Sequence, residues 1–330
     1  MLSGKVACGE YNIPVVDFKL LVNGTTDQRS QAIRDLGRAC EDWGFFMVIN
    51  HGVPEALKEA VMKAFSEVLS LPEEETAEYL EAASMDPIQI GTGYYSATDE
   101  AQHLRHYLKM FVHPEFHCPA KPERLRDIAA KFATQTRHLM QQLAMAISES
   151  LGLHDGRIPQ ALNLDSSIQM LAQNHYPEYT GTDGVATALP PHTDPGIFAL
   201  IFQNGVDGLQ VQHNGQWILA TPVPGAFFVL AGDQLEIVTN ERYRAVIHRA
   251  VIGHEQTRTS VISMLAPCPD AVIEPVQELV AGSRVRVGFR GIKFRDNIIA
   301  HQRSNRANGQ TAKDVVRAQD GVTAHTEQCL

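Results

Sequence analysis

The stretch Pro191-His192-Thr193-Asp194-Pro195 places two metal-ligand side chains two residues apart, in the middle of a region of short β-like runs. Side chains two apart on a strand point to the same side, so the imidazole of His192 and the carboxylate of Asp194 can converge on one point. Taken alone, the pattern His-x-Asp is weak evidence for a metal. A His near a strand end is more often a surface or hydrogen-bonded residue.

The sequence pattern around this stretch indicates an antiparallel β structure. After residue 165, short β-prone runs alternate with Gly, Pro, Asn and Asp. Strands this short and this regularly interrupted are typical of a sandwich or barrel. The expected strands are residues 168–175, 198–203, 208–213, 216–221, 226–231, 245–251 and 259–265.

The N-terminal half has a helical periodicity instead. Apolar residues recur every three or four positions over 122–151, and Gly152 follows as a C-terminal cap. We expect a mainly β protein with flanking helices: an N-terminal helical and strand region (1–165) packed on a β core (166–285), then a C-terminal helix and tail (286–330). The other expected elements are helices at 27–43, 54–70 and 292–302, and strands at 13–18 and 45–49.

Two segments of the N-terminal half are predicted to be loops. Residues 81–96 mix polar and Gly residues and predict an irregular surface loop. His103, His106, His113 and His117 form a loose His-rich stretch, but no carboxylate or Cys lies at a metal-binding spacing from them. We therefore interpret that stretch as a solvated loop rather than a second metal site.

The composition argues against several classes of protein. Of 330 residues, 44% are hydrophobic, which is enough to bury a large core. The five cysteines are odd in number and contain no Cys-x-x-Cys pair, which argues against a disulfide framework or structural zinc. A formal charge of −10 without a basic stripe argues against nucleic acid. With no apolar run long enough for a membrane span or a signal peptide, we expect a cytoplasmic protein. A monomer is the default expectation.

A second histidine extends the candidate metal site. His248 lies inside the otherwise apolar, β-prone run 244–251, where a polar side chain is either hydrogen-bonded or employed as a ligand. Two His and one carboxylate form the facial triad typical of non-haem Fe(II) oxygenases, which leaves neighbouring coordination positions open. Zinc also takes His and carboxylate ligands, so the triad alone does not fix the metal.

A third pair of polar residues follows shortly after His248. Arg258 and Ser260 are two apart and face the same side of an expected strand. A guanidinium with a hydroxyl beside it is a good receptor for a small carboxylate. Arg258 and Ser260 could instead be two surface residues. The apolar run 261–265 that continues the strand argues against this alternative.

The order of these motifs resembles the 2-oxoglutarate/Fe(II)-dependent dioxygenases of the isopenicillin-N-synthase-like, plant-type group. The likeness covers most of the chain. Besides the site residues, it rests on the segments Ile13-Pro14-Val15-Val16-Asp17, Trp43-Gly44-Phe45-Phe46-Met47-Val48-Ile49-Asn50-His51-Gly52-Val53-Pro54, Asn174-His175-Tyr176-Pro177, Gly208-Leu209-Gln210-Val211 and Gly232-Asp233-Gln234-Leu235-Glu236.

The resemblance implies a double-stranded β-helix, or jelly-roll, core wrapped by helices. It implies that the triad binds Fe(II), and that 2-oxoglutarate and O2 are cosubstrates, with ascorbate supportive. Arg258 and Ser260 would hold the distal carboxylate of 2-oxoglutarate, and Tyr176 with Asn174 would hydrogen-bond it near the metal. The substrate would be hydroxylated or desaturated with release of succinate and CO2.

The same resemblance gives an expectation for the substrate. Tyr107, Phe111, Phe198 and Met264 fall where the pocket walls would be and suggest a hydrophobic, aromatic small molecule. The chain looks most like flavonoid- and salicylate-oxidising members, so a flavanone is the first expectation. It departs from them at Leu104-Arg105-His106-Tyr107, and at Ala172, where some flavonoid enzymes carry a substrate-contacting lysine.

Three alternatives stay open from the sequence. One is oxidation of a phenolic or hormone-like acid of the salicylate or auxin type. A second is an oxidase on the same scaffold that does not use 2-oxoglutarate. The third is a non-catalytic binding protein that uses its metal only to hold a ligand.

Overall fold

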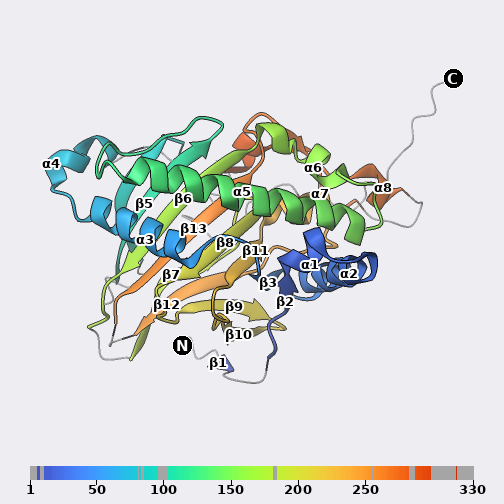
Figure 1. Cartoon of the computed structure of the whole chain (residues 1–330), viewed down its shortest axis with the longest axis horizontal. Helices are drawn as coiled ribbons and strands as arrows, with labels where there is room; N and C mark the ends of the chain where they lie inside the picture. The colour runs from blue at the N-terminus through green and yellow to red at the C-terminus, as the bar shows by residue number, and fades with distance from the viewer. Residues whose placement is uncertain are drawn as a thin grey trace.

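Two β-sheets packed face to face form the centre of the molecule, as the computed structural model shows (Figure 1). The structure describes residues 6–7, 11–80, 82, 85–95, 103–180, 184–253, 256–281, 287–298 and 317. The large sheet has the strand order β2-β3-β11-β8-β13-β6-β5-β4, and the small sheet has the order β1-β10-β9-β12-β7. These two sheets are the jelly roll that the sequence predicts.

Most strands begin and end within a few residues of the predicted runs. The bounds in the large sheet are β2 Val15–Asp17, β3 Phe45–Ile49, β4 Ile88–Tyr95, β5 His103–His113, β6 Ile168–Tyr176, β8 Phe198–Gln203, β11 Phe227–Ala231 and β13 Arg258–Ala266. Those in the small sheet are β1 Val6–Ala7, β7 Val185–His192, β9 Leu209–His213, β10 Gln216–Leu219 and β12 His248–Gly253. The short pair β14 Val272–Ile273 and β15 Ile292–Lys293 lies apart from both sheets.

The helices cover the outer face of the large sheet, with the long α5 lying across it (Figure 1). At the start of α2, Thr25 and Gln28 form a capping box. Gly44 follows α2 at φ +62, a conformation that favours glycine. The bounds are α1 Phe18–Asn23, α2 Thr26–Asp42, α3 Glu55–Leu69, α4 Glu73–Thr76, α5 Leu125–Ser150, α6 Arg157–Ala161, α7 Asp233–Val238 and α8 Gln277–Val280. No helix among the described residues is long and apolar enough to span a bilayer.

The large sheet is buried on both faces. On β8, Phe198, Leu200 and Phe202 pack into the core beneath the helices, whereas Ala199 and Ile201 pack into a second core between the two sheets. Alternate residues of one strand therefore belong to different cores. This alternation decides which side chains can reach a site between the sheets.

The predicted loop at residues 81–96 is wrong, because β4 occupies much of it. β4 pairs antiparallel with β5 over its whole length, so the His-rich stretch is also largely a strand rather than a solvated loop. Gly91 is needed there, since a Cβ at this position would lie 2.6 Å from the Tyr107 hydroxyl. Gly91, one of the glycines that made the segment look irregular, instead makes room for an aromatic ring of the next strand.

The predicted helix at 292–302 is only partly present. Its first two residues form β15, and residues 294–298 are helical. The remainder of this prediction lies outside the described residues. From the rest of the C-terminal tail the structure describes Arg317, which forms an isolated antiparallel bridge with Phe289.

Candidate active site

The three predicted metal ligands meet at one point between the sheets. His192 ends β7 and His248 begins β12, and the two residues are direct partners in the antiparallel pairing of these strands. The Nε2 atoms of both histidines lie 3.8 Å from Oδ1 of Asp194. One ligand atom from each residue lies within 4.8 Å of the other two. This arrangement can hold one metal ion on one face and leave the opposite face open.

Backbone carbonyl groups orient both imidazoles for metal binding. Nδ1 of His192 lies 2.8 Å from the carbonyl oxygen of Pro190, and Nδ1 of His248 lies 3.2 Å from that of Val246. When Nδ1 donates its hydrogen to a carbonyl, the lone pair is on Nε2, which faces the other ligands. Burial also lowers the pKa of His248 to about 4, so its imidazole is neutral at physiological pH.

The predicted carboxylate receptor lies beside the triad. Arg258 is the cross-strand partner of Tyr176, and Ser260 is that of Asn174, because β13 pairs with β6 in this register. All four side chains line the same cavity as the triad. Two pairs of residues, picked from distant parts of the sequence, are therefore neighbours on one wall.

Arg258 is a buried cation whose surroundings suit an anionic ligand. It is only 2% exposed, and Nη2 donates to Oε1 of Gln203 at 3.0 Å. Its Nε is buried without a hydrogen-bond partner, and no described carboxylate lies within ion-pair distance. A buried cation is costly unless it is compensated, so this donor set fits the carboxylate of a bound keto acid.

Comparison with known proteins agrees with these donors. A model of the 2OG-Fe(II) oxygenase superfamily matches residues 167–267, and a model of the non-haem dioxygenase in morphine synthesis N-terminal region matches residues 13–131. 2-Oxoglutarate-dependent dioxygenase 19 of Oryza sativa subsp. japonica is 59% identical, over 92% of this chain and 90% of its own. This chain belongs to the 2OG-Fe(II) oxygenase superfamily. It is an enzyme of the dioxygenase class, with Fe(II) and 2-oxoglutarate as its cofactors.

Other relatives of the oxygenase differ in what they are named for. Flavanone 3-dioxygenase 2 of the same rice is 34% identical, over 81% of this chain and 77% of its own. Protein DMR6-LIKE OXYGENASE 2 of Arabidopsis thaliana is 33% identical, over 82% of this chain and 77% of its own. The crystal structure of JOX2 with 2OG, Fe and JA has a TM-score of 0.76 at 25% identity, and the match covers 88% of this chain and 84% of that one.

The cavity of the oxygenase has a volume of about 420 Å³, within the range of small-molecule sites. Of the four predicted pocket residues, Phe111 and Met264 line it. The structure does not bring Phe198 to it, because this side chain packs beneath the helices. Tyr107 is also absent from the lining and lies between two cationic residues of β5. The other apolar lining includes Ile168, Met170, Leu189, Ile201, Ile262, Phe294 and Ile298.

Tyr176 places a buried phenol at this cavity. It is 1% exposed, and the guanidinium carbon of Arg258 lies 5.5 Å from its ring centroid. Burial raises the pKa of the Tyr176 phenol, although the positive charges of Arg258 and Arg105 act to lower it. The phenol therefore keeps its proton at neutral pH and can donate it to an oxygen of a bound keto acid.

Helix α7 supports the loop that carries Asp194. The amide of Asp233 donates to the carbonyl of Asp194 at 2.8 Å, and the amide of Gln234 donates to that of Gly196 at 3.0 Å. This close approach explains Gly232, because a Cβ there would lie 2.3 Å from the carbonyl oxygen of Gly196. The Gly232-Asp233-Gln234 motif thus fixes the backbone behind a metal ligand.

We expect Gly232→Ala to weaken iron binding and to lower the free energy of unfolding by roughly 1–3 kcal/mol, since the added methyl group must push α7 and the Asp194 loop apart. Iron content and thermal melting of the purified variant check both effects. Gly253→Ala is the matched control, because the nearest atom to a Cβ at that glycine lies 3.8 Å away. Wild-type iron content in Gly232→Ala would show that this contact does not position Asp194.

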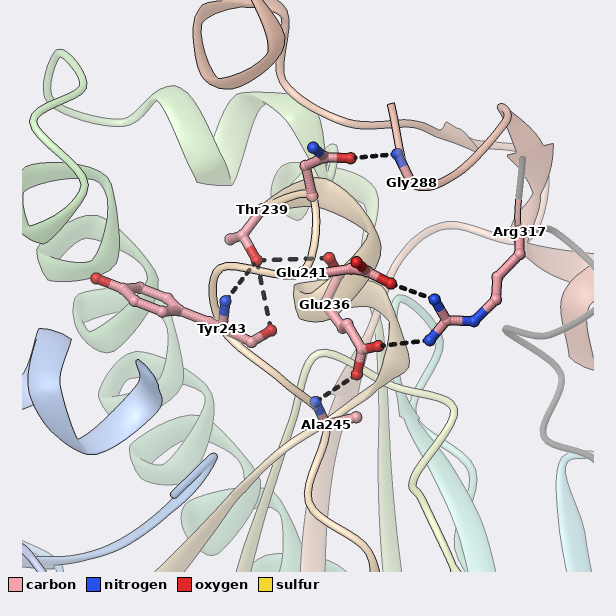
Figure 2. A network of polar contacts seen from close by, with 8 residues as sticks. Glu236, Thr239, Glu241, Tyr243, Ala245, Gly288 and Arg317 are labelled. Carbon is pink, nitrogen blue, oxygen red and sulfur yellow. Dashed lines mark hydrogen bonds and ion pairs between the residues drawn. The ribbon is translucent and has the colours of Figure 1, made fainter. Parts of the chain in front are cut away.

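Glu236 connects α7 to the strand of His248, a role the sequence did not reveal. Its carboxylate accepts the amide of Ala245 at 2.7 Å, three residues before His248. Figure 2 shows the same carboxylate facing Arg317, whose Nη2 lies 3.7 Å from Oε1 of Glu236. Arg317 also forms an ion pair with Glu241. Glu236 lies in a motif that the resemblance quotes, but no sequence signal pointed to Arg317.

Proposed function

We propose that this oxygenase hydroxylates or desaturates a small hydrophobic, aromatic metabolite while 2-oxoglutarate is converted to succinate and CO2. The observation that carries the proposal is the buried Arg258, which lines the cavity beside the triad with no carboxylate of the described residues within ion-pair distance. When bound, the iron supplies the oxidising chemistry that the side chains of the cavity lack.

The side chains of the cavity wall divide the work of binding. Arg258 and Ser260 hold the distal carboxylate of 2-oxoglutarate, in which the guanidinium supplies a charged donor and the hydroxyl a neutral one. Asn174 and the protonated Tyr176 bind the oxygen atoms nearer the metal. His192, Asp194 and His248 hold the metal itself.

The apolar wall selects the substrate. Phe111, Met264 and their neighbours exclude water from the space next to the triad and favour an apolar molecule. A flavanone suits such a wall, and a relative at 34% identity is named for flavanone oxidation. The second candidate is an apolar carboxylic acid, which two cationic side chains on β5 favour.

The test is a substrate screen scored by succinate release and by product mass. Purified protein is supplied with Fe(II), O2 and 2-oxoglutarate, together with flavanones, phenolic acids and indole or cyclopentanone acids. We expect substrate-dependent succinate formation with a product 16 Da heavier or 2 Da lighter. Unchanged product formation without 2-oxoglutarate would instead favour an oxidase. An Asp194→Ala variant that lost iron but kept its biological effect would favour a binding protein.

A further inference from the structure

The cavity carries more positive charge than iron and 2-oxoglutarate require. Among the residues that the structure describes, the charged lining consists of one carboxylate, Asp194, and four cationic side chains, Arg105, Lys109, Arg249 and Arg258. A divalent metal and a dianionic keto acid cancel each other in charge. Asp194 then offsets one of the four cations, which leaves an excess of positive charge in a protein whose formal charge is −10.

Two of these four cations have other partners. Arg258 faces the keto acid, as argued above. Arg249 is turned toward the small sheet, where its Nε donates to Oε1 of Gln210 at 2.8 Å and its guanidinium lies 4.2 Å from the ring of Trp217. Arg105 also hydrogen-bonds the phenol of Tyr176, but a neutral phenol does not offset its charge. The excess positive charge at the cavity therefore comes from Arg105 and Lys109.

Arg105 and Lys109 both lie close to the ring of Tyr107. The guanidinium carbon of Arg105 lies 4.8 Å from the ring centroid of Tyr107, and Nζ of Lys109 lies 5.1 Å from it. Among the residues that the structure describes, no carboxylate is within ion-pair distance of either cation. Two like charges share one wall of a half-enclosed space, which is unfavourable until an anion joins them.

The electrostatics of Lys109 agree with this geometry. Burial, with a smaller contribution from the nearby charge of Arg105, lowers the pKa of the Lys109 ammonium to about 8, while Asp194 acts to raise it. A bound anion would stabilise the ammonium form and relieve both unfavourable effects.

The position of Lys109 in the sheet brings it next to the reacting region. Lys109 is the cross-strand partner of Ala172, and both line the cavity. The small side chain of Ala172 leaves room for the long side chain beside it.

We propose that Arg105 and Lys109 form a receptor for the carboxylate of the substrate, so that the oxygenase acts on an apolar carboxylic acid rather than on a neutral flavanone. This inference rests on the proposed function and names its substrate class. The carboxylate binds at β5, and the apolar part of the acid lies along Phe111 and Met264 toward the triad.

Binding of matched neutral and charged probes tests the receptor. Equilibrium dialysis of the protein loaded with Fe(II) and 2-oxoglutarate, without O2, measures the Kd of 1-naphthaleneacetate and of its methyl ester. We expect the wild type to bind the acid on the order of tenfold more tightly, as one charge-assisted hydrogen bond provides. Lys109→Met should lose most of this preference. Lys131→Met removes an exposed lysine of α5 and should keep it.

Equal affinity of the wild type for acid and ester would overturn the receptor, and so would a Lys109→Met variant that keeps the preference. Tighter binding of naringenin than of its 7-O-methyl ether, without a preference for the acid, would assign the cations to a phenolate and also overturn it. Failure of the proposed function is distinguishable, because it appears as absent succinate formation with every substrate. The dialysis experiment measures binding alone, so its result does not depend on turnover.

Discussion

Replacing His248 with alanine is expected to abolish iron binding and to lower turnover by about a thousandfold or more, while the chain stays folded. The variant keeps only two ligands, His192 and Asp194, and two ligands hold a divalent metal far more weakly than three. Without the metal, no side chain at the cavity can supply the oxidising chemistry. Folding should persist because the two cores that hold the sheets together do not depend on this imidazole.

Iron content, measured after anaerobic loading and desalting, checks the first part of this expectation, and circular dichroism melting of the metal-free protein checks the second. His213→Ala is the matched control, because His213 ends a neighbouring strand of the same sheet and stacks on Trp43 rather than on the triad. This control should keep its iron. If His248→Ala kept iron but unfolded at a much lower temperature, His248 would be a structural residue.

The triad could be read from the sequence because its signal is local and chemical. His192 and Asp194 two apart are weak evidence taken alone, but His248 in an apolar run completes a set of side chains that suits one metal ion. In the structure, the register of β7 and β12 pairs His192 directly with His248, as a shared metal site requires. An antiparallel sandwich or barrel was predictable for a related reason, since short β-prone runs between turn residues indicate most of its strands. That it is a jelly roll was implied by the family resemblance.

The pocket walls were less predictable, because strands such as β8 and β13 are buried on both faces. A strand with one exposed face shows an alternation that tells which residues point inward, whereas β8 is apolar throughout. Phe198 was therefore expected in the pocket although it packs beneath the helices. On β5, Arg105 and Lys109 lie in the His-rich stretch that was interpreted as a solvated loop, and they line the cavity instead.

Contacts between residues far apart in the chain could not be predicted from the sequence. The ion pair between Arg317 and Glu236 joins the tail to the helix behind the triad, and neither residue type nor spacing points to it. The same holds for Gly91, whose lack of a side chain makes room for the ring of Tyr107 on the neighbouring strand, a contact that only the structure reveals.

Replacing Arg258 with lysine is expected to raise the KM for 2-oxoglutarate by roughly 10- to 100-fold while iron binding stays at the wild-type level. Lysine keeps the positive charge, so any loss reports on geometry rather than on charge. The planar guanidinium makes paired contacts with a carboxylate, and a single ammonium does not reproduce them. The loss of one charge-assisted hydrogen bond, about 1.5–3 kcal/mol, corresponds to this range.

Uncoupled succinate formation in the absence of substrate measures the KM for 2-oxoglutarate directly, so this prediction does not depend on the identity of the substrate. Arg249→Lys is the matched control, since Arg249 lines the same cavity but its guanidinium is bound to Gln210 and Trp217. We expect its KM for 2-oxoglutarate to change by less than about threefold. Equal effects of the two substitutions would mean that the cavity needs only positive charge, and that Arg258 has no special place at the keto acid. A selective effect at Arg258 would assign the buried guanidinium to the cosubstrate and leave Arg105 and Lys109 for the substrate.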